Sequence, residues 1–199
     1  MERKKVLVIV AHPDDEIIWM GGTLIRYSLK NIWDLTIISL CRKNDIDREP
    51  RFRKVCEVLN AEGFISDLED EKLNKINKKE IIFRIKEFIK NMEYDYVFTH
   101  GSNGEYGHIR HKDVHNAVSY MVNKKIISCK KFFNFSYKKI KSRSFNFCEC
   151  YVKKNADKFI NLNEIEFLKK KEIIQNIYGF KKGSFEERNC REIEAFDEK

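Results

Sequence analysis

The 199-residue chain has little of what divides a polypeptide or anchors it in a membrane. It contains only two prolines and eight glycines, and no Ser/Gly/Pro-rich linker separates one part from another. No stretch approaches the ~20 apolar residues that a membrane-spanning helix needs, and the first apolar run begins too early for a signal peptide to precede it. We therefore expect one domain over residues 1–199, with no membrane span and a cytoplasmic location.

The cysteine and glycine patterns argue against two further classes of protein. The six cysteines, at positions 41, 56, 129, 148, 150 and 190, follow no metal-binding pattern, so we expect reduced thiols. No G-x-G-x-x-G motif follows the first apolar run, and acidic residues stand where a dinucleotide-binding enzyme would hold the pyrophosphate. A cysteine-based structural zinc site and a nucleotide-binding Rossmann enzyme are both disfavoured.

Basic residues outnumber acidic residues. With 39 Lys+Arg against 31 Asp+Glu the chain has a formal net charge of +8, and short lysine pairs interleave with Phe and Tyr in its second half. A basic nucleic-acid or anionic-carbohydrate binding protein without hydrolytic activity is therefore an alternative. Because the pairs are scattered and form no continuous tract, we expect no nucleic-acid partner and assign the charge to attraction of a phosphorylated or nucleotide-linked substrate.

Apolar runs and amphipathic segments alternate along the chain. Strands are expected at residues 5–11, 34–41, 64–68 and 94–100, and helices at 16–30, 49–61, 77–91 and 110–123. Residues 132–137 and 145–152 alternate like strands, and 163–178 has a helical pattern with lysines on an exposed face. The tail beyond residue 183 is expected either to close over a substrate or to form a solvated end. This alternation predicts an α/β fold, a Rossmann-like three-layer sandwich with a mostly parallel central sheet.

An imidazole and three carboxylates follow the first apolar run, residues 6–11. The sequence there is His12-Pro13-Asp14-Asp15-Glu16, and a glycine pair stands at 21 and 22. Ligands bind at the carboxyl ends of strands in open α/β sheets, so this cluster predicts a metal or catalytic site. A helix cap formed by Asp14 or Asp15 is the alternative, but capping accounts for only one carboxylate.

Histidines follow a second apolar run, residues 94–98. Four of the five histidines lie in or just after the segment 99–111, at positions 100, 108, 111 and 115. A histidine and a carboxylate from one strand end, with a histidine from another, make the three-ligand site that is typical of catalytic zinc. With a further carboxylate as general base and a spare histidine near an oxyanion, these residues are suited to hydrolysis of an amide or ester.

Two segments resemble the signature motifs of the LmbE-like, or PIG-L, zinc-dependent N-deacetylases. They are residues 11–16 with Gly21-Gly22-Thr23-Leu24, and residues 107–111 with Val114-His115. The resemblance implies three Zn²⁺ ligands, His12, Asp15 and His111. It also implies that Asp14 is the general base and that His108 stabilises the oxyanion and assists departure of the amine. Family members typically deacylate a glucosamine-type sugar, and Fe²⁺ is compatible with the same ligands.

Two arginines are candidate substrate-binding residues. Arg48 resembles an arginine that family members use near the substrate, with a surface helix cap as the alternative. Arg110, with Ile109, stands where several family members have a Pro-Asp pair whose Asp faces the catalytic histidine. Arg110 would lower the pKa of His108 or grip an anionic group of the substrate, but an exposed arginine on a helix is the interpretation that we favour.

The two remaining histidines are not expected to bind the metal. His115 lies one turn after His111 and is predicted to pack in the core or against a ligand, and His100 is predicted to be a loop residue near the pocket. These assignments predict a zinc-dependent hydrolase that removes an acetyl or other acyl group from the amine of an N-acetylglucosamine-type sugar or glycoconjugate. The expected partner is that small molecule, and a homo-oligomer is compatible with the sequence.

Overall fold

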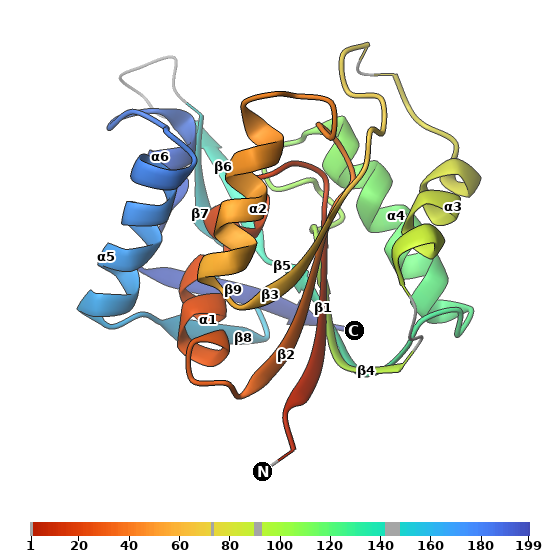
Figure 1. Ribbon diagram of the computed structural model, residues 1–199, viewed down its shortest axis with the longest axis horizontal. Helices are drawn as coiled ribbons and strands as arrows, with labels where there is room; N and C mark the ends of the chain where they lie inside the picture. Colours follow the sequence, from red (N-terminus) through yellow and green to blue (C-terminus); the bar gives the residue numbers. More distant parts are fainter. Residues whose placement is uncertain (1, 73, 90–92, 142–147) are drawn as a thin grey trace.

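The computed structural model describes residues 2–72, 74–89, 93–141 and 148–199 (Figure 1). Within these ranges a seven-stranded sheet has the order β3-β2-β1-β4-β5-β9-β8. The strands from β3 to β5 are parallel, β9 pairs antiparallel with β5, and β8 pairs antiparallel with β9. Their bounds are β1 Lys4–Val10, β2 Trp33–Ser39, β3 Ala61–Ile65, β4 Glu93–Thr99, β5 Ser128–Phe135, β8 Lys158–Asn161 and β9 Ile193–Glu198.

Helices cover both faces of this sheet (Figure 1). One face carries α1 (Asp15–Ser28), α2 (Arg48–Val58), α5 (Glu164–Glu172), a π-helical turn η1 (Ile173–Ile177) and α6 (Phe185–Asn189). The other face carries α3 (Lys78–Phe88) and α4 (Ile109–Asn123). Each layer of helices encloses its own apolar core against the sheet, so the predicted three-layer α/β sandwich is confirmed.

The central strand β1 places the first motif. Its residues 6–10 have no exposed surface, as expected for a strand that is covered on both faces. Helix α1, which follows β1, packs on one face of the sheet, whereas α4, which follows β4, packs on the other (Figure 1). Because β1 and β4 are neighbours whose chains leave in opposite directions, a crevice opens between their carboxyl ends. Both predicted motifs lie at this crevice.

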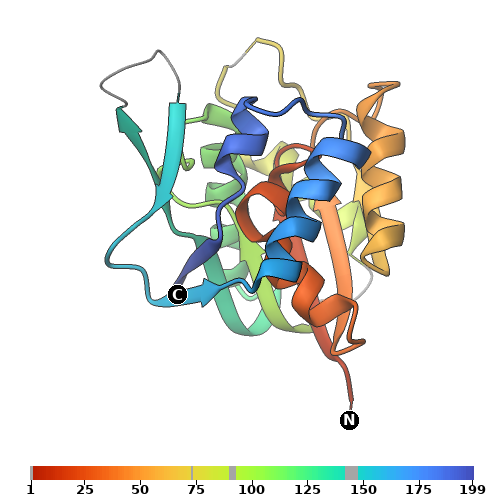
Figure 2. The same ribbon diagram turned by 90° about the vertical axis from the view of Figure 1, so that its left-hand side faces the viewer.

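Several elements differ in extent from the predictions. Strand β3 begins at Ala61, earlier than the strand expected at 64–68, because Asn60 adopts a positive φ of 51° and ends the preceding helix abruptly. The pattern at 132–137 spans the end of β5 and the start of β6 (Tyr137–Lys141), which forms an antiparallel hairpin with β7 (Cys148–Val152) outside the main sheet (Figure 2). Residues 90–91 of one predicted helix and 145–147 of one predicted strand lie outside the described residues.

The C-terminal segment differs more. Part of the tail beyond residue 183 is not a solvated end, because β9 joins the main sheet and buries Ala195 and Phe196. Lys170 was expected on an exposed helix face, but it is fully buried in an ion pair with Glu194, 2.7 Å between Nζ and Oε1. Strand β9 is short and rich in acidic residues, so its local pattern gave little indication of a buried strand.

Two further expectations concern anchoring and redox state. Among the helices of the described residues, none is long and apolar enough to cross a membrane. The thiols of all six cysteines are free.

Candidate metal and catalytic site

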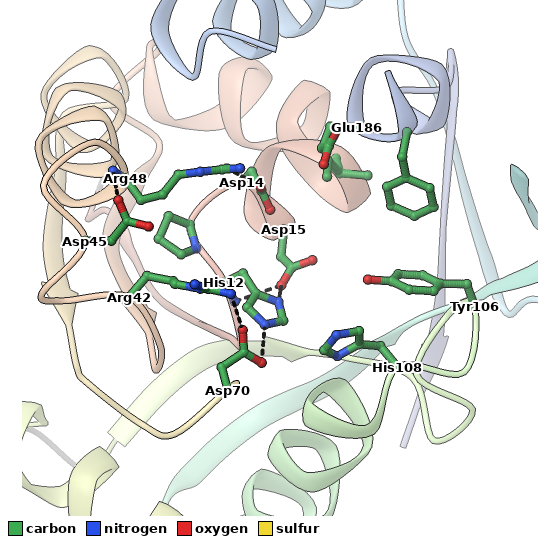
Figure 3. Close-up of a pocket in the computed structure, with 13 residues that line it drawn as sticks. His12, Asp14, Asp15, Arg42, Asp45, Arg48, Asp70, Tyr106, His108 and Glu186 are labelled. Atoms are coloured by element: carbon green, nitrogen blue, oxygen red, sulfur yellow. Dashed lines mark hydrogen bonds and ion pairs between the residues drawn. The ribbon is translucent and has the colours of Figure 1, made fainter. Parts of the chain in front are cut away.

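A cavity of about 290 Å³ opens at the carboxyl ends of β1 and β4. Its wall is formed by the turn between β1 and α1, the segment between β2 and α2, the segment between β3 and α3, the loop between β4 and α4, and the starts of the helices α1, α2 and α6. The lining residues are His12, Pro13, Asp14, Asp15, Ile18, Arg42, Asp45, Arg48, Asp70, Tyr106, His108, Phe185 and Glu186 (Figure 3). The two motifs are thus brought together by the sheet, although they are about a hundred residues apart in the chain.

Three predicted ligands converge beneath this cavity. Nδ1 of His12 lies 3.2 Å from Oδ2 of Asp15 and 3.3 Å from Nε2 of His111. Nε2 of His111 lies 3.4 Å from Oδ1 of Asp15. Ligand atoms around a tetrahedral metal with bonds of about 2.0–2.1 Å are separated by about 3.3–3.4 Å. His12 Nδ1 and His111 Nε2 therefore have the spacing of two corners of a tetrahedral site, and Asp15 presents one carboxylate oxygen to each of them.

The outer nitrogens of both histidines face carboxylates. Nε2 of His12 lies 3.0 Å from Oδ1 of Asp70, and Nδ1 of His111 lies 2.5 Å from Oε2 of Glu105. Metal-binding histidines commonly donate the outer N–H to a carboxylate in this way. That tautomer leaves the lone pairs of His12 Nδ1 and His111 Nε2 pointing at each other and at Asp15. Two imidazole nitrogens and a carboxylate oxygen fit Zn²⁺ or Fe²⁺.

The electrostatics of the site favour a cation. Burial by itself lowers the pKa of His12, yet hydrogen bonds to Asp15 and Asp70 raise that pKa to about 10. Burial opposes ionisation of Asp15, but His111 and His100, followed by His12, hold its pKa well below the ordinary value. Trp19 also donates its indole N–H to Asp15, at 3.0 Å. Asp15 is therefore an ionised carboxylate in a fixed orientation.

His100 and His115 lie on the side of His111 that faces away from the cavity. His100 lies in the loop after β4, as expected, but it is fully buried and stacked on His111, with ring centroids 3.9 Å apart, and it does not line the cavity. Its Nε2 accepts the Ala11 N–H at 2.9 Å, and its Nδ1 lies 3.0 Å from Glu105. His115 lies one layer further out, with Nδ1 2.8 Å from the His100 carbonyl oxygen. The strand end β4 is thereby tied to helix α4.

Asp14 precedes α1 but does not cap it. It occupies the N-cap position without a side-chain capping bond, and its carboxylate instead accepts a hydrogen bond from Arg48 Nη1 at 2.8 Å. The carboxylate faces the cavity beside that of Asp15 (Figure 3). Burial and the charge of Asp15 raise the pKa of Asp14 above its ordinary value, and Arg48 opposes that shift. Capping therefore does not account for Asp14.

His108 stands at the start of α4 and faces the cavity (Figure 3). Its Nδ1 accepts the Arg110 N–H at 3.3 Å, which leaves the proton of the neutral ring on Nε2. Burial lowers the pKa of His108 to about 4, and His111 and His12 add to that effect. The ring is therefore a neutral hydrogen-bond donor near pH 7.

The two candidate arginines have different positions. Arg48 lines the cavity, and its guanidinium lies over the ring of Phe180, 4.3 Å from the centroid. Arg110 is fully buried, which contradicts the expected exposed arginine. Its Nη1 donates to Asp113 at 2.8 Å and to the Asn74 carbonyl oxygen at 3.1 Å. Helix α4 turns this side chain toward the segment between β3 and α3, so Arg110 has no surface on the cavity.

Sequence reasoning missed several residues of the cavity, and two of them, Asp70 and Tyr106, bear directly on its chemistry. Asp70 lies in the segment between β3 and α3, where no strand, helix or motif singles it out, and its Oδ2 accepts a hydrogen bond from Arg42 at 2.8 Å. Tyr106 lies in the glycine-containing loop before His108 and points its hydroxyl into the cavity (Figure 3). Burial raises the pKa of Tyr106, so the phenol remains a donor. The position of Tyr106 in the histidine-containing segment 99–111 was the one available signal.

Structures with the same fold include enzymes of two kinds. An N,N'-diacetylchitobiose deacetylase from Pyrococcus horikoshii superposes with a TM-score of 0.69 at 16% identity, covering 100% of this chain and 84% of that one. A 4-carboxy-2-hydroxymuconate hydratase, GalB, from Pseudomonas putida KT2440 superposes with a TM-score of 0.67 at 17% identity, covering 94% and 83%. At these identities the similarity establishes the fold.

Sequence similarity gives more specific information about ancestry than similarity of fold does. An uncharacterised protein, L374, of Acanthamoeba polyphaga mimivirus is 30% identical over 120 residues, which are 54% of this chain and 53% of the relative. The chain thus matches about half the length of that curated relative. Residues 7–122, which contain both motifs, match the family model described as PIG-L, GlcNAc-PI de-N-acetylase. The chain belongs to the PIG-L family.

Proposed function

We propose that this protein is a metal-dependent N-deacetylase that removes an acetyl or other acyl group from the amine of an N-acetylglucosamine-type sugar or glycoconjugate. The observation that carries the proposal is the convergence of His12, Asp15 and His111 beside Asp14. The carboxylate of Asp14 lines the cavity and is not one of the three proposed metal ligands. A separate base next to a three-ligand metal site is an arrangement that supports metal-dependent amide hydrolysis. Membership of the PIG-L family supports the same reaction.

The metal is proposed to be Zn²⁺, with Fe²⁺ as the alternative. The donor set of two imidazoles and one carboxylate suits either ion and leaves coordination positions open. Bound by His12, Asp15 and His111, the ion would supply a Lewis acid that polarises the substrate carbonyl and lowers the pKa of water.

The chain's own residues account for the proton transfers. Asp14 is held by Arg48 so that its carboxylate faces the cavity, and there it accepts a proton from the attacking water. The water oxygen bonds to the carbonyl carbon, the C–N bond of the resulting tetrahedral carbon breaks, and the proton passes from Asp14 to the departing nitrogen. Amide and water become amine and carboxylic acid, which releases its proton to solvent, so Asp14 ends the cycle as it began.

Two hydrogen-bond donors face Asp14 across the cavity. His108 offers its Nε2–H, and Tyr106 offers its hydroxyl (Figure 3). Donors placed in advance at the carbonyl oxygen stabilise the negative charge that develops there. In this proposal His108 and Tyr106 are the groups that bind the oxyanion.

The cavity suits an amino sugar with an anionic substituent. Polar side chains form most of its wall, and Ile18 and Phe185 add an apolar surface for a sugar ring. Arg42 and Arg48 reach its rim (Figure 3), where each already pairs with a carboxylate, Asp70 and Asp14 respectively. We propose that their remaining N–H groups bind a phosphate or carboxylate of the substrate. The chitobiose deacetylase with the same fold supports a sugar substrate, but the hydratase shows that the fold also accommodates other chemistry.

Release of free amine tests the proposal. Chelator-treated protein, and the same protein reloaded with Zn²⁺ or Fe²⁺, should be assayed on N-acetylglucosamine, its 1-phosphate, a lipid-linked form and a nucleotide-linked form. We expect metal-dependent release of amine and acetate, with the preferred compound identifying the substituent. Stoichiometric metal without release from any of them would contradict the proposal, and sugar binding without release would support the carbohydrate-binding alternative. Metal-dependent hydration of 4-carboxy-2-hydroxymuconate would support the hydratase chemistry instead.

A further inference from the structure

The backbone at Asp14 has an unusual conformation. Its φ of 116° and ψ of −31° lie in a region that non-glycine residues rarely adopt. Such a conformation persists only where the surrounding structure holds it. This bend directs the Asp14 side chain into the cavity while Asp15 points to the metal ligands.

One set of contacts holds the Asp14 backbone. Its N–H donates to Oε2 of Glu16 at 3.1 Å, and Oε1 of the same carboxylate accepts a hydrogen bond from the hydroxyl of Tyr178, 2.5 Å away. Glu16 has no exposed surface and Tyr178 is almost fully buried. One oxygen of Glu16 therefore accepts the Asp14 N–H. The other accepts the hydroxyl of Tyr178, which lies 162 positions further along the chain.

A second set of contacts holds the Asp14 carboxylate. Arg48 donates to its Oδ2, and the Arg48 guanidinium in turn lies over the ring of Phe180. A cation stacked on an aromatic face has a restricted position. Tyr178 and Phe180 are two positions apart, so one short segment of the chain holds both the backbone and the side chain of Asp14.

Residues 173–180, which we call the brace, carry both Tyr178 and Phe180. The brace begins with the π-helical turn η1, an element that is rare and frequent near functional sites. It is fixed to α2 because Arg51 donates to the Ile177 carbonyl oxygen at 2.9 Å. Gly179, with φ of 77°, lies so close to Arg51 that an added Cβ would fall 2.4 Å from the guanidinium. The brace lies beyond residues 7–122, which the family model matches.

We propose that the brace positions Asp14 for proton transfer, through Tyr178 and Glu16 to its backbone and through Phe180 and Arg48 to its carboxylate. Tyr178, Glu16 and Phe180 are positioning residues, because none of them reaches the reacting atoms. This inference rests on the proposed role of Asp14 as the general base.

The kinetic test uses Tyr178→Phe, which removes one hydroxyl. On the substrate found by the amine-release panel, we expect kcat to fall by about 10- to 100-fold, because small misplacements of a catalytic group have effects of that size. KM and bound metal should remain close to the wild-type values. Tyr137→Phe is the matched control: it removes another buried hydroxyl that bonds to α1, at the Trp19 carbonyl, but makes no contact with Asp14 or Glu16. Its kcat should stay within about threefold of wild type.

A double variant distinguishes positioning from general loss of structure. In an Asp14→Asn background, Tyr178→Phe should have almost no further effect on kcat, because residues that act as one unit are not additive. If the fold-loss of kcat in the double variant equals the product of the two single fold-losses, Tyr178 acts independently of Asp14, and the proposal is overturned. Phe180→Leu, at a half-buried position, tests the second set of contacts if Tyr178→Phe does not fold.

Crystal structures of the wild type and Tyr178→Phe supply a test that does not depend on turnover. We expect the Asp14 bend to relax, with loss of the Asp14–Glu16 hydrogen bond, while His12, Asp15 and His111 remain in place. An unchanged Asp14 with unchanged kcat would overturn the positioning role even if the protein is an active deacetylase. A displaced Asp14 in a protein that hydrolyses no amide would instead uphold the brace and reject the proposed function.

Discussion

Oδ1 of Asp70 lies 3.0 Å from Nε2 of His12, so a carboxylate holds the imidazole on the side away from Asp15 and His111, the other two proposed ligands. The segment that carries Asp70 belongs to no strand or helix. Arg42 donates to Oδ2 of Asp70, and the buried Arg110 lies 3.9 Å from Oδ1. The guanidiniums of Arg42 and Arg110 therefore hold Asp70 beside His12. Arg110 contacts this carboxylate although it does not line the cavity.

Asp70→Asn should weaken metal binding. Loss of the carboxylate makes the imidazole of His12 a poorer ligand and loosens its orientation, and changes of this kind cost about 10- to 100-fold in metal affinity. Competition with a chromophoric chelator measures the effect. Asp67→Asn is the control, because Asp67 lies in the same segment but pairs with Arg84 at the surface. Equal affinities for Asp70→Asn and the wild type would show that Asp70 does not support the ligand.

Asp14→Asn should separate metal binding from catalysis. Because Asn cannot accept the proton of the attacking water, we expect kcat to fall by about 10²- to 10⁴-fold with metal content unchanged. Amine release by metal-loaded protein and elemental analysis of the same sample give both quantities. Asp95→Asn is the control, since Asp95 pairs with Lys130 near the end of β4 that lies opposite the cavity. Full turnover by Asp14→Asn would remove Asp14 from the base role.

Lys170→Met should be strongly destabilising. Glu194 accepts hydrogen bonds from the N–H groups of Gly22 and Thr23, and Lys170 neutralises it where neither charge is exposed. Removing one partner leaves a buried charge, which costs about 3–5 kcal/mol. Urea unfolding measures the difference. Lys171→Met, which affects a more exposed pair with Glu187, should cost about 1 kcal/mol or less. Similar losses for the two variants would contradict this account.

The ion pair between Arg26 and Glu166 should give a pH-dependent contribution to stability. Hydrogen bonds from Arg26, against a smaller effect of burial, hold the pKa of Glu166 below its ordinary value of 4.5. A lowered carboxyl pKa gives stability that is fully present above the unfolded value and is lost as the pH falls through the folded value. Glu166→Gln should therefore lose about 1 kcal/mol at pH 7, and this loss should shrink below about pH 4.5.

Chemical unfolding of wild type and Glu166→Gln at pH 7, 5, 4 and 3 measures that difference. Glu164→Gln is the control, because Glu164 lies in the first turn of the same helix. A difference between wild type and Glu166→Gln that grows toward acid pH would show that the sign of the linkage is wrong.

The sequence by itself was sufficient for the fold class and for the place of the two motifs. A buried run that ends before His12 and another that ends before His100 both predicted strands of a parallel sheet. Because carboxyl ends of neighbouring parallel strands meet at one edge, these local patterns predicted that the two motifs lie together, and the resemblance to the PIG-L family named His12, Asp15 and His111 as the ligands.

Other features were decided only by the tertiary structure. Asp70 contacts the site from a segment with no distinctive periodicity, and Tyr178 does so from the end of a predicted helix. The contact that places each residue spans many positions of the chain. Arg110 looked like a surface residue because its carboxylate partners, at 70 and 113, could not be recognised as partners before the helix was packed. Burial of a charged side chain depends on which opposite charge meets it, and that is set by the packing of distant elements rather than by the pattern along one element.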